Sequence, residues 1–446
     1  MRLNLFALIL CSIAQTAVSQ PIDTVAQIDK LFSSWNNATP GGSVLVARGE
    51  NILYHKAFGL ANLESNVPNT INTIFEAGSV SKQFTAYSIL LLESEGKLKL
   101  SDDVRKYIPE LPVYEAPVTI QHCLNHTSGL KDWGSVAAIS GWPRTTKVYT
   151  LELALQIMER QKSTNFRPGD EYSYSNSNYS LLVAIIEKVS KQRLEDFTKE
   201  RIFKPLGMND TRWRSNFKEI VRNRAQSYDG RHGKFELLMP FENTYGHGGL
   251  LTTTGDLLKW NQLLEKHDAI YNKRIERGKL NNGTSISYAA GLQHGEVNRI
   301  AEIAHSGATA GYRAWLAYYP GRKLSVVLLS NDGEFAPFSV GHEIAEIYFG
   351  AVEDPDEHDG HEPLPEFKYN PKLYIGEYYS DEAACTFRVI QKGDSLFAIN
   401  DALVEIPMKG ASLNVFDLNG GRLEFNKTGF NLSVDRAKNV PFKKIR

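Results

Sequence analysis

Four serine–lysine pairs in this chain have the spacing Ser-x-x-Lys, which on a helix places a lysine amine beside a serine hydroxyl and so can pair a nucleophile with its base. The four pairs are Ser79–Lys82, Ser94–Lys97, Ser128–Lys131 and Ser215–Lys218. Only Ser79 follows a glycine and opens a long apolar run, which predicts a buried helix over residues 79–95. The start of such a helix offers free backbone amides for an oxyanion, and burial lowers the pKa of a lysine. Ser79 and Lys82 are therefore our candidate nucleophile and base, although the pair alone also fits a capping serine beside an exposed lysine.

A second polar stretch, Tyr174-Ser175-Asn176, follows a Pro-Gly turn and precedes another apolar helical run. On extended chain, residues two apart point to the same side, so Tyr174 and Asn176 would face one site together. A tyrosine hydroxyl can exchange protons with a nucleophile or leaving group, and an asparagine amide can hold a substrate carbonyl. Taken alone, the stretch fits equally well an asparagine that caps a helix and a tyrosine that packs in the core.

A third stretch, His305-Ser306-Gly307, leads into a predicted strand. There Gly307 would let a substrate lie along the strand edge and meet backbone N–H groups. No metal site is predicted, because no histidine follows His342-Glu343 at the spacing of a zinc-binding helix.

In the order Ser-x-x-Lys, Tyr-x-Asn and His-x-Gly, these motifs resemble the serine hydrolase superfamily of class C β-lactamases, D-alanyl-D-alanine carboxypeptidases, D-aminopeptidases and related esterases. Two glycine-containing stretches, CLNHTSGL at 123–130 and GHGGLLTTTGDLLKW at 246–260, are similar to the turns that border the cleft in that family. The resemblance covers roughly residues 22–350, and the chain beyond residue 368 resembles the small β-barrel module appended in some members.

The resemblance implies a catalytic role for several residues. Ser79 would be the acylated nucleophile, and Lys82 and Tyr174 would share its proton and pass it to the leaving group. The backbone N–H groups of Ser79 and Ala308 would form the oxyanion hole, where loss of one donor typically costs roughly 100- to 1000-fold in rate. Serine acylation requires no metal or organic cofactor, and none is expected.

The resemblance also implies contacts with the substrate. Asn176 would orient the acyl side chain, and His305 and Ser306 would meet the substrate's carboxylate or its equivalent, with Gly307 beside them on the strand edge. Class C β-lactamases carry a lysine where this chain has His305. A histidine, with an ordinary pKa of about 6.5, is a weaker and pH-dependent anchor for a carboxylate, which favours a peptidase or esterase over an efficient β-lactamase.

These residues need a scaffold of elements drawn from distant parts of the chain. Apolar spacing predicts a helix at 22–37, a two-stranded hairpin at 41–61 and a second strand pair at 309–331. Helical segments broken by proline and glycine fill residues 100–240, and a closing helix is predicted at 342–350. The expected fold is α+β: an α/β/α sandwich with an antiparallel sheet flanked by helices, plus a helical lobe across a cleft, followed by a small all-β C-terminal barrel domain.

The N-terminus predicts export. Residues 1–19 have a short positive start, an apolar run and an Ala-Val-Ser site, which indicates a signal peptide cleaved between Ser19 and Gln20. The run is too short for a bilayer span of about 20 residues, so we expect a secreted or periplasmic protein with no stable membrane span; an N-terminal anchor or a buried helix is the alternative. The other predicted parts are a hydrolase domain at 20–350, an acidic Pro-containing linker at 351–367 and a small antiparallel β-barrel at 368–446.

The composition of the 446 residues is that of an ordinary globular protein, with 42% hydrophobic and 23% charged residues. The formal net charge of −1 gives no sign of a basic surface, so no nucleic-acid partner is expected. Beyond the signal peptide the chain has two cysteines, Cys123 and Cys385, for which we expect free buried thiols, with an interdomain disulfide as the alternative. The sequence does not indicate an oligomeric state.

The preferred hypothesis is a secreted serine peptidase that works through an acyl-enzyme on Ser79 and acts on D-amino-acid-containing or small peptides, in the manner of a D,D-carboxypeptidase or an aminopeptidase. The alternatives are a carboxylesterase of broad specificity and a class C-like β-lactamase, so the expected partner is a small peptide, ester or β-lactam substrate. A protein of another class, a non-catalytic penicillin-binding or scaffold protein, would have no need of Ser79, Lys82 and Tyr174 together, and their presence argues against it.

Overall fold

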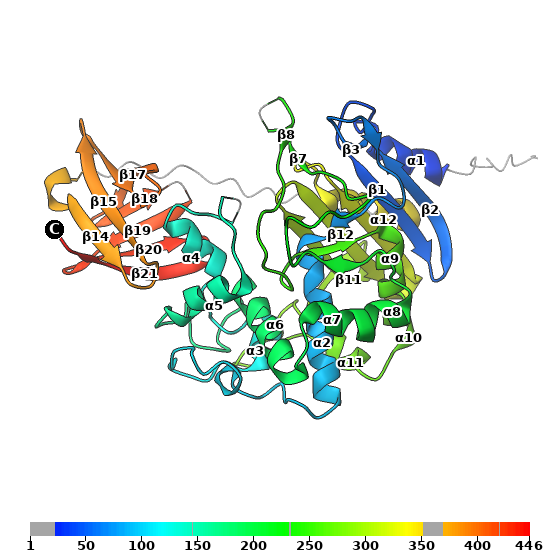
Figure 1. Cartoon of the computed structure of the whole chain (residues 1–446), viewed down its shortest axis with the longest axis horizontal. Coiled ribbons are helices and arrows are strands. Elements are labelled where there is room, and N and C mark those ends of the chain that lie inside the picture. Colours follow the sequence, from blue (N-terminus) through cyan, green and yellow to red (C-terminus); the bar gives the residue numbers. More distant parts are fainter. Residues whose placement is uncertain (1–22, 145, 232, 351–368, 419) are drawn as a thin grey trace, which may run out of the picture.

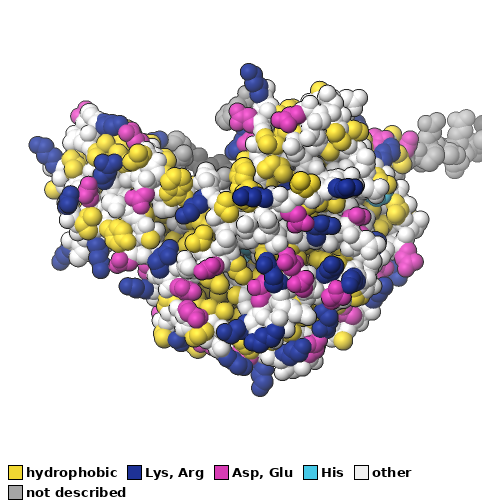
Figure 2. Space-filling view, in the orientation of Figure 1, with side chains coloured by type: hydrophobic (Ala, Val, Ile, Leu, Met, Phe, Trp, Pro, Cys, Tyr) yellow, Lys and Arg dark blue, Asp and Glu magenta, His cyan; other side chains and the backbone are white. Residues whose placement is uncertain are grey.

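Two bodies make up the computed structural model of the chain: an α/β unit with a helical lobe, and a barrel that runs from Gly376 to Lys444 (Figure 1). The structure describes residues 23–144, 146–231, 233–350, 369–418 and 420–446. The predicted signal peptide and acidic linker therefore lie outside the described residues. Within those described ranges, no helix is long and apolar enough to cross a membrane. On the face seen in Figure 2, basic and acidic side chains are interspersed.

One antiparallel sheet of six strands, in the order β10-β11-β12-β13-β1-β2, forms the centre of the larger body. Its strands are β1 (Gly42–Arg48), β2 (Asn51–Phe58), β10 (Gln293–Val297), β11 (Ile300–Thr309), β12 (Tyr312–Tyr319) and β13 (Leu324–Ser330). β1 pairs with β13, so strands from the two ends of this body lie side by side and the predicted assembly of the sheet from distant segments is confirmed. β10 is an exposed edge strand of sequence QHGEV, and it carries too little apolar pattern to be predicted.

Side chains of the inner strands alternate between two buried faces. Val44 and Val46 of β1 pack in one cluster with Ile344 of α12, whereas Leu45 and Ala47 belong to the cluster on the opposite face. The helices over the first face are α1 (Thr24–Leu31) and α12 (Pro337–Phe349), and those over the second are α2 (Lys82–Ser94) and α9 (Thr254–Asn261). The result is the predicted α/β/α sandwich.

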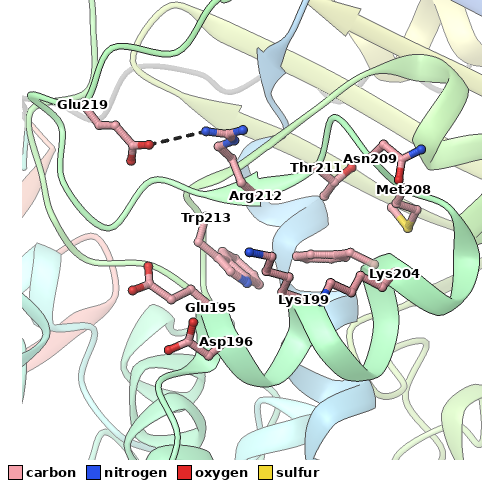
Figure 3. Close-up of a pocket in the computed structure, with 11 residues that line it drawn as sticks. Glu195, Asp196, Lys199, Lys204, Met208, Asn209, Thr211, Arg212, Trp213 and Glu219 are labelled. Atoms are coloured by element: carbon pink, nitrogen blue, oxygen red, sulfur yellow. Dashed lines mark hydrogen bonds and ion pairs between the residues drawn. The ribbon is translucent and has the colours of Figure 1, made fainter.

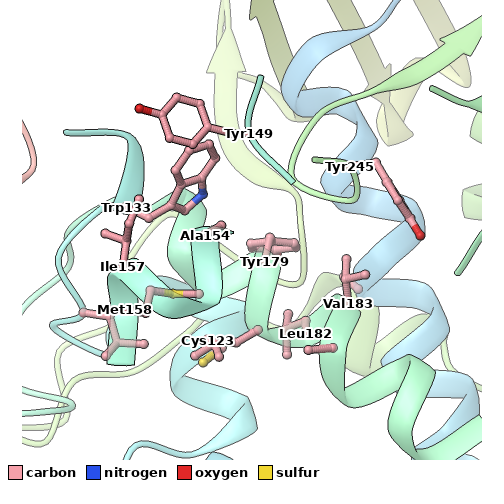
Figure 4. Packing of buried hydrophobic residues seen from close by; sticks show 14 of the residues in the cluster. Cys123, Trp133, Tyr149, Ala154, Ile157, Met158, Tyr179, Leu182, Val183 and Tyr245 are labelled. Carbon is pink, nitrogen blue, oxygen red and sulfur yellow. The ribbon is translucent and has the colours of Figure 1, made fainter. Parts of the chain in front are cut away.

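A helical lobe stands beside the sheet. Its helices are α3 (Ile120–Asn125), α4 (Trp133–Ile139), α5 (Leu151–Glu159), α6 (Asn176–Ser190), α7 (Leu194–Thr198) and α8 (Lys204–Leu206). α6 is buried over most of its length, because its sequence NSNYSLLVAIIEKVS is apolar on successive turns. Figure 4 shows Tyr179 and Leu182 of this helix in one cluster with Trp133 and Tyr149. This packing fixes the first turn of α6, where Asn176 lies.

Short elements join the sandwich to the lobe. They are β3 (Leu60–Asn62), β4 (Val67–Pro68), β5 (Phe75–Glu76), β6 (Arg212–Trp213), β7 (Tyr228–Asp229), β8 (Glu236–Leu237), β9 (Leu250–Thr252), α10 (Leu263–Lys266) and α11 (Tyr271–Ile275). β5 pairs with β9, with Phe75 opposite Thr252. The segment just before Ser79 is therefore tied to the glycine-rich stretch 246–260.

The C-terminal body is a closed barrel of eight antiparallel strands, in which β14 pairs with β21 to complete the circle. The strands are β14 (Gly376–Ser380), β15 (Cys385–Lys392), β16 (Ser395–Ile399), β17 (Glu405–Ser412), β18 (Val415–Leu418), β19 (Gly421–Phe425), β20 (Gly429–Val434) and β21 (Ala437–Lys444). Aromatic rings fill its interior, among them the buried Phe387, Phe416, Phe430 and Phe442. The predicted small antiparallel barrel is confirmed.

The barrel lies next to α4 of the helical lobe in Figure 1 and makes buried polar contacts with the lobe. Lys131 Nζ lies 3.1 Å from the Glu382 carboxylate of the barrel, and both side chains are buried. Gln161 donates to the backbone carbonyl of Glu382 at 2.8 Å, and Asn165 donates to the backbone carbonyl of Arg436 at 3.0 Å. These contacts hold one edge of the barrel against the lobe.

The two cysteines among the described residues, Cys123 in α3 and Cys385 in β15, are both buried and free. Burial raises the pKa of both thiols, so they remain protonated and pack as small apolar side chains. The prediction of free buried thiols is confirmed.

Candidate active site

Ser79 lies in a single turn of 3-10 helix, η1 (Gly78–Ser81), that runs directly into α2. In such a turn residues i and i+3 eclipse each other, so Ser79 and Lys82 share one face, and Lys82 Nζ lies 3.2 Å from Ser79 Oγ. Gly78 has a φ of +51°, and a Cβ there would lie 2.6 Å from the backbone nitrogen of Ala308. Glycine is needed at this position because the turn must approach β11 closely.

The Lys82 amine is fully buried and held by three oxygens. It donates to Ser79 Oγ, to Asn176 Oδ1 at 2.9 Å and to the backbone carbonyl of His247 at 2.6 Å. A hydroxyl, an amide and a peptide carbonyl carry no negative charge. The lysine therefore has hydrogen-bond partners but no carboxylate bound directly to it.

Electrostatics favour the neutral form of this amine. Burial is the main cause that holds the pKa of Lys82 well below its ordinary value, and the positive charges of Arg144 and Arg436 lower it further. Asp132 and Glu242 oppose this shift but contribute less. The amine can therefore lose its proton more readily than an ordinary lysine and accept one from a hydroxyl beside it.

Tyr174 lies across the same lysine, with its ring centroid 4.8 Å from Lys82 Nζ and 4.2 Å from the ring of His126. Its hydroxyl oxygen is buried and makes no hydrogen bond to the residues that the structure describes. Burial raises the pKa of Tyr174, an effect that the positive charge of Arg436 partly offsets. The phenol therefore stays protonated at neutral pH, the form that can donate a proton to a leaving group.

Tyr174 and Asn176 point to the same side of the chain, as predicted. Ser175 between them has extended backbone, with φ of −141° and ψ of 128°. Asn176 opens α6 and directs Oδ1 to Lys82, while its amide nitrogen makes no hydrogen bond within the described part of the chain. That nitrogen is a free donor, and its contact with a substrate carbonyl stays a prediction.

The sequence alone did not identify two residues that hold the segment 174–176 in place. His126 Nδ1 accepts from the Ser175 backbone N–H at 3.1 Å and is 3.1 Å from Asn178 Nδ2, and its ring packs against Tyr174 at a tilt of 35°. Asp132 Oδ2 accepts from the Asn176 backbone N–H at 2.6 Å, and its other oxygen caps α4. The signals were the histidine inside CLNHTSGL and an aspartate directly before a helical run.

The edge of β11 faces the Ser79 turn. The pairing of β10 with β11 ends at Ala304, so the following residues have no strand beside them on that side among the described residues. A Cβ on Gly307 would collide with the carbonyl oxygen of Ala77, which shows how closely η1 approaches. A cleft of about 250 Å³ lies next to this edge, lined in part by Ala308 and Thr309. This geometry is compatible with an oxyanion hole formed by the backbone N–H groups of Ser79 and Ala308, which stays a prediction.

His305 is buried, and its imidazole ring is neutral. The side chain is 2% exposed, Nδ1 donates to the Ser306 carbonyl at 2.6 Å, and Nε2 accepts from the Tyr288 hydroxyl at 2.9 Å. Burial, with a smaller effect of Lys82, lowers the pKa of His305 to about 3. Both ring nitrogens are thus used inside the protein, and the contact of His305 with a substrate carboxylate or its equivalent stays a prediction. Ser306, which is half-buried, stays a predicted contact.

In each of the other three Ser-x-x-Lys pairs, the serine and lysine side chains make no hydrogen bond to each other in the structure. Lys97 pairs with Glu95, and Lys131 binds Glu382 and Ser163. Lys218 is exposed. Only Ser79 and Lys82 form the predicted pair of hydroxyl and amine.

One other pocket lacks the side chains that this chemistry needs. Figure 3 shows a pocket of about 440 Å³ on the helical lobe with Trp213 at its wall and charged residues around it. Its described lining residues include no serine, cysteine or histidine. Nor does the described part of the chain contain a group of three or more histidine, cysteine or acidic side chains that could hold a metal ion.

The model of the family described as Beta-lactamase matches residues 23–347. The chain belongs to the beta-lactamase family. It is 36% identical over 313 residues to penicillin-binding protein 4* of Bacillus subtilis (strain 168), covering 66% of this chain and 68% of that protein. It is 28% identical over 418 residues to a D-aminopeptidase of Cereibacter sphaeroides (strain ATCC 17029 / ATH 2.4.9), covering 90% of this chain and 76% of that protein.

Solved structures agree with the fold. The octameric penicillin-binding protein homologue from Pyrococcus abyssi superposes with a TM-score of 0.61 at 25% identity, over 93% of this chain and 97% of that one. D-amino acid amidase from Ochrobactrum anthropi SV3, solved with L-phenylalanine, has a TM-score of 0.60 at 21% identity, over 73% and 99%. This beta-lactamase family member is a serine hydrolase of the type that includes penicillin-binding proteins and D-aminopeptidases.

Proposed function

We propose that this protein is a secreted serine peptidase that cleaves small peptides containing D-amino acids through an acyl-enzyme on Ser79. The observation that carries the proposal is the Ser79–Lys82 pair, a hydroxyl 3.2 Å from a buried amine of lowered pKa. The relatives named D-aminopeptidase support a substrate with D-residues. Secretion rests on the predicted signal peptide at 1–19 alone.

The reaction divides into two acyl transfers. Ser79 Oγ attacks the carbonyl carbon of the scissile amide while the neutral Lys82 amine accepts its proton. The oxyanion that forms lies at the Ser79 and Ala308 backbone amides. Tyr174 then donates its proton to the amide nitrogen and recovers one from Lys82, so the C–N bond breaks and the amine leaves. Water attacks the Ser79 ester in the second step, releasing the acid and restoring the hydroxyl.

The neutral His305 bears on the alternatives. A β-lactamase that depends on a cation at this position would find none, because burial lowers the pKa of His305 to about 3. A non-catalytic scaffold would have no use for a buried lysine without a carboxylate partner, since its burial costs stability. An esterase would use the same Ser79–Lys82 pair, and substrate choice separates it from a peptidase.

The test compares release of amines and alcohols by the mature protein from Gln20. N-acetyl-D-alanyl-D-alanine, D-alanine p-nitroanilide and their L-counterparts are offered beside p-nitrophenyl acetate, with Ser79→Ala and Ser215→Ala as matched variants. We expect hydrolysis of at least one D-peptide substrate over its L-form, abolished by Ser79→Ala and unchanged by Ser215→Ala. Hydrolysis of the ester alone would make the protein an esterase, and peptide cleavage that survives Ser79→Ala would contradict the proposal.

A further inference from the structure

The tight turn between β20 and β21 holds Asp435 and Arg436 of the barrel against the helical lobe, next to Tyr174. The Arg436 carbonyl accepts from the Asp132 backbone N–H at 3.2 Å and from Asn165 Nδ2 at 3.0 Å. Asp435 Oδ2 accepts from Ser135 Oγ at 2.7 Å. Figure 1 shows β20 and β21 beside α4, the helix that Asp132 caps. The turn is thus held on the lobe by its backbone and by Asp435, so its position does not depend on the Arg436 side chain.

The Arg436 guanidinium lies against the predicted catalytic residues. Its Cζ is 5.7 Å from the centroid of the Tyr174 ring, and the side chain is 34% exposed. Nε donates to Asp435 at 3.1 Å, whereas Nη1 and Nη2 make no hydrogen bond to the described residues. Nη1 forms an ion pair with Asp132 at 3.7 Å but no hydrogen bond, because Asp132 already accepts three backbone N–H groups. Two donors of a charged, planar group therefore remain open next to Tyr174.

The other cationic candidates around Ser79 are already occupied. The Lys82 amine donates hydrogen bonds to three oxygens inside the protein. Arg144 forms a bidentate pair with Glu242, and Arg313 donates to the carbonyls of Ala310 and Tyr312. His305, at the position where the resemblance led us to expect an anchor, is neutral and committed to its own hydrogen bonds. Arg436 forms ion pairs with Asp132 and Asp435, but its Nη1 and Nη2 atoms make no hydrogen bond to the described residues and lie next to Tyr174.

We propose that Arg436 binds a carboxylate of the peptide substrate, so that the C-terminal barrel supplies a specificity-determining residue to the active site of the hydrolase body. The inference rests on the proposed peptidase function and narrows its substrates to peptides with a free carboxylate near the scissile bond. A guanidinium recognises a carboxylate through two parallel N–H···O bonds, which the open Nη1 and Nη2 donors can make.

The decisive experiment measures binding apart from turnover. In the Ser79→Ala background of the mature full chain, calorimetry gives the Kd of N-acetyl-D-alanyl-D-alanine and of its C-terminal amide, with and without Arg436→Gln. Loss of a charged hydrogen bond predicts about 10- to 100-fold weaker binding of the acid and a change of less than about threefold for the amide. Arg436→Lys should restore part of the affinity. Arg422→Gln, an exposed arginine of the same barrel, is the control and should change neither Kd.

Kinetic measurements on the active enzyme then distinguish a failure of the proposed role of Arg436 from a failure of the proposed peptidase function. With Ser79 intact, Arg436→Gln should raise the KM for N-acetyl-D-alanyl-D-alanine by a larger factor than the KM for its C-terminal amide, because only the acid offers the carboxylate. Equal weakening of acid and amide, or no weakening of either, would overturn the role of Arg436. If Arg436 governs binding of the acid but the wild type cleaves no peptide, carboxylate recognition stands and the peptidase proposal fails. If peptides are cleaved and Arg436→Gln changes nothing, the proposal about Arg436 alone fails.

Discussion

Two buried Ser-x-x-Lys sites in this chain, Ser79–Lys82 and Ser128–Lys131, have the same spacing and the same low exposure of the lysine, but different surroundings. Lys82 is bonded to a hydroxyl and two neutral oxygens, whereas Lys131 lies 3.1 Å from the carboxylate of Glu382. Burial lowers the pKa of both amines, and at Lys131 the carboxylate opposes that effect. A buried lysine with a carboxylate partner stays charged and links two bodies, while one without it can act as a base.

The serines of the two sites differ in the same way. Ser128 Oγ donates to Asn178 Oδ1 at 2.5 Å and accepts from the Leu130 N–H at 3.1 Å, so its hydroxyl is committed to the local turn. Ser79 Oγ is bonded to Lys82 and lies at the close approach of η1 and β11. Spacing identifies candidates, and the charge and hydrogen bonding around each lysine decide which one fits catalysis.

The largest expected contrast is between the two serines. Ser79→Ala should lower kcat/KM on any cleaved substrate by roughly 10⁴-fold or more, as loss of a nucleophile does. Ser128→Ala should cost only about 1 kcal/mol of unfolding free energy through its lost hydrogen bond and keep activity per folded molecule. Steady-state kinetics with thermal unfolding checks both. Equal losses of activity at the two positions would contradict the assignment of Ser79, and not Ser128, as the nucleophile.

Substitution of the lysines should separate activity from stability. Lys82→Met should reduce kcat by roughly 10²- to 10⁴-fold, because the base is lost. Lys131→Met should leave Glu382 buried without a partner and cost about 3–5 kcal/mol of unfolding free energy, with activity kept in the molecules that remain folded. Lys131→Met combined with Glu382→Gln should recover part of that stability. An unchanged unfolding midpoint in Lys131→Met would mean that the buried pair contributes nothing.

A smaller effect is expected at Tyr174. Tyr174→Phe keeps the ring that packs against His126 and removes the buried hydroxyl. Because that hydroxyl is proposed to protonate the leaving group, kcat for a peptide should fall by roughly 100-fold, within the usual range for a general acid. An activated ester, whose leaving group needs no proton, should be affected less. An identical loss for both substrates would remove the proton-donor role.

The smallest predicted effect is a shift of the pH profile. The rate should rise with pH as Lys82 loses its proton, since only the neutral amine accepts one from Ser79. Arg436 lowers the pKa of Lys82, so Arg436→Gln should raise that pKa and move the acid limb of kcat/KM for p-nitrophenyl acetate to higher pH. Arg422→Gln should leave the limb in place. A shift to lower pH in Arg436→Gln would contradict the electrostatic account.

Much of the scaffold follows from local patterns along the chain. The hairpin of β1 and β2, the strands β12 and β13, the buried helix after Ser79 and the barrel strands all carry apolar alternation or helical spacing that predicts them. The order Ser79, Lys82, Tyr174, Asn176 also marks the site, because each residue lies in a short motif with a glycine or proline nearby.

The remaining features depend on contacts between distant segments. His305 is buried, with a hydrogen bond to Tyr288 and the Tyr174 ring nearby, and no local sequence pattern predicts either contact. Arg436 lies in an ordinary turn of the barrel, far along the chain from Ser79, and only the docking of the barrel on the lobe brings it to Tyr174. The roles of such residues can be inferred only when the fold shows which residues surround them.

The most direct test of the central claim, that Ser79 and no other serine is acylated, is the intact mass of the mature protein after incubation with benzylpenicillin, followed by peptide mapping. The account predicts a covalent adduct on the wild type and on Ser128→Ala, mapped to Ser79 and absent from Ser79→Ala. An adduct that persists in Ser79→Ala, or one that maps to Ser128 or another serine, would contradict it.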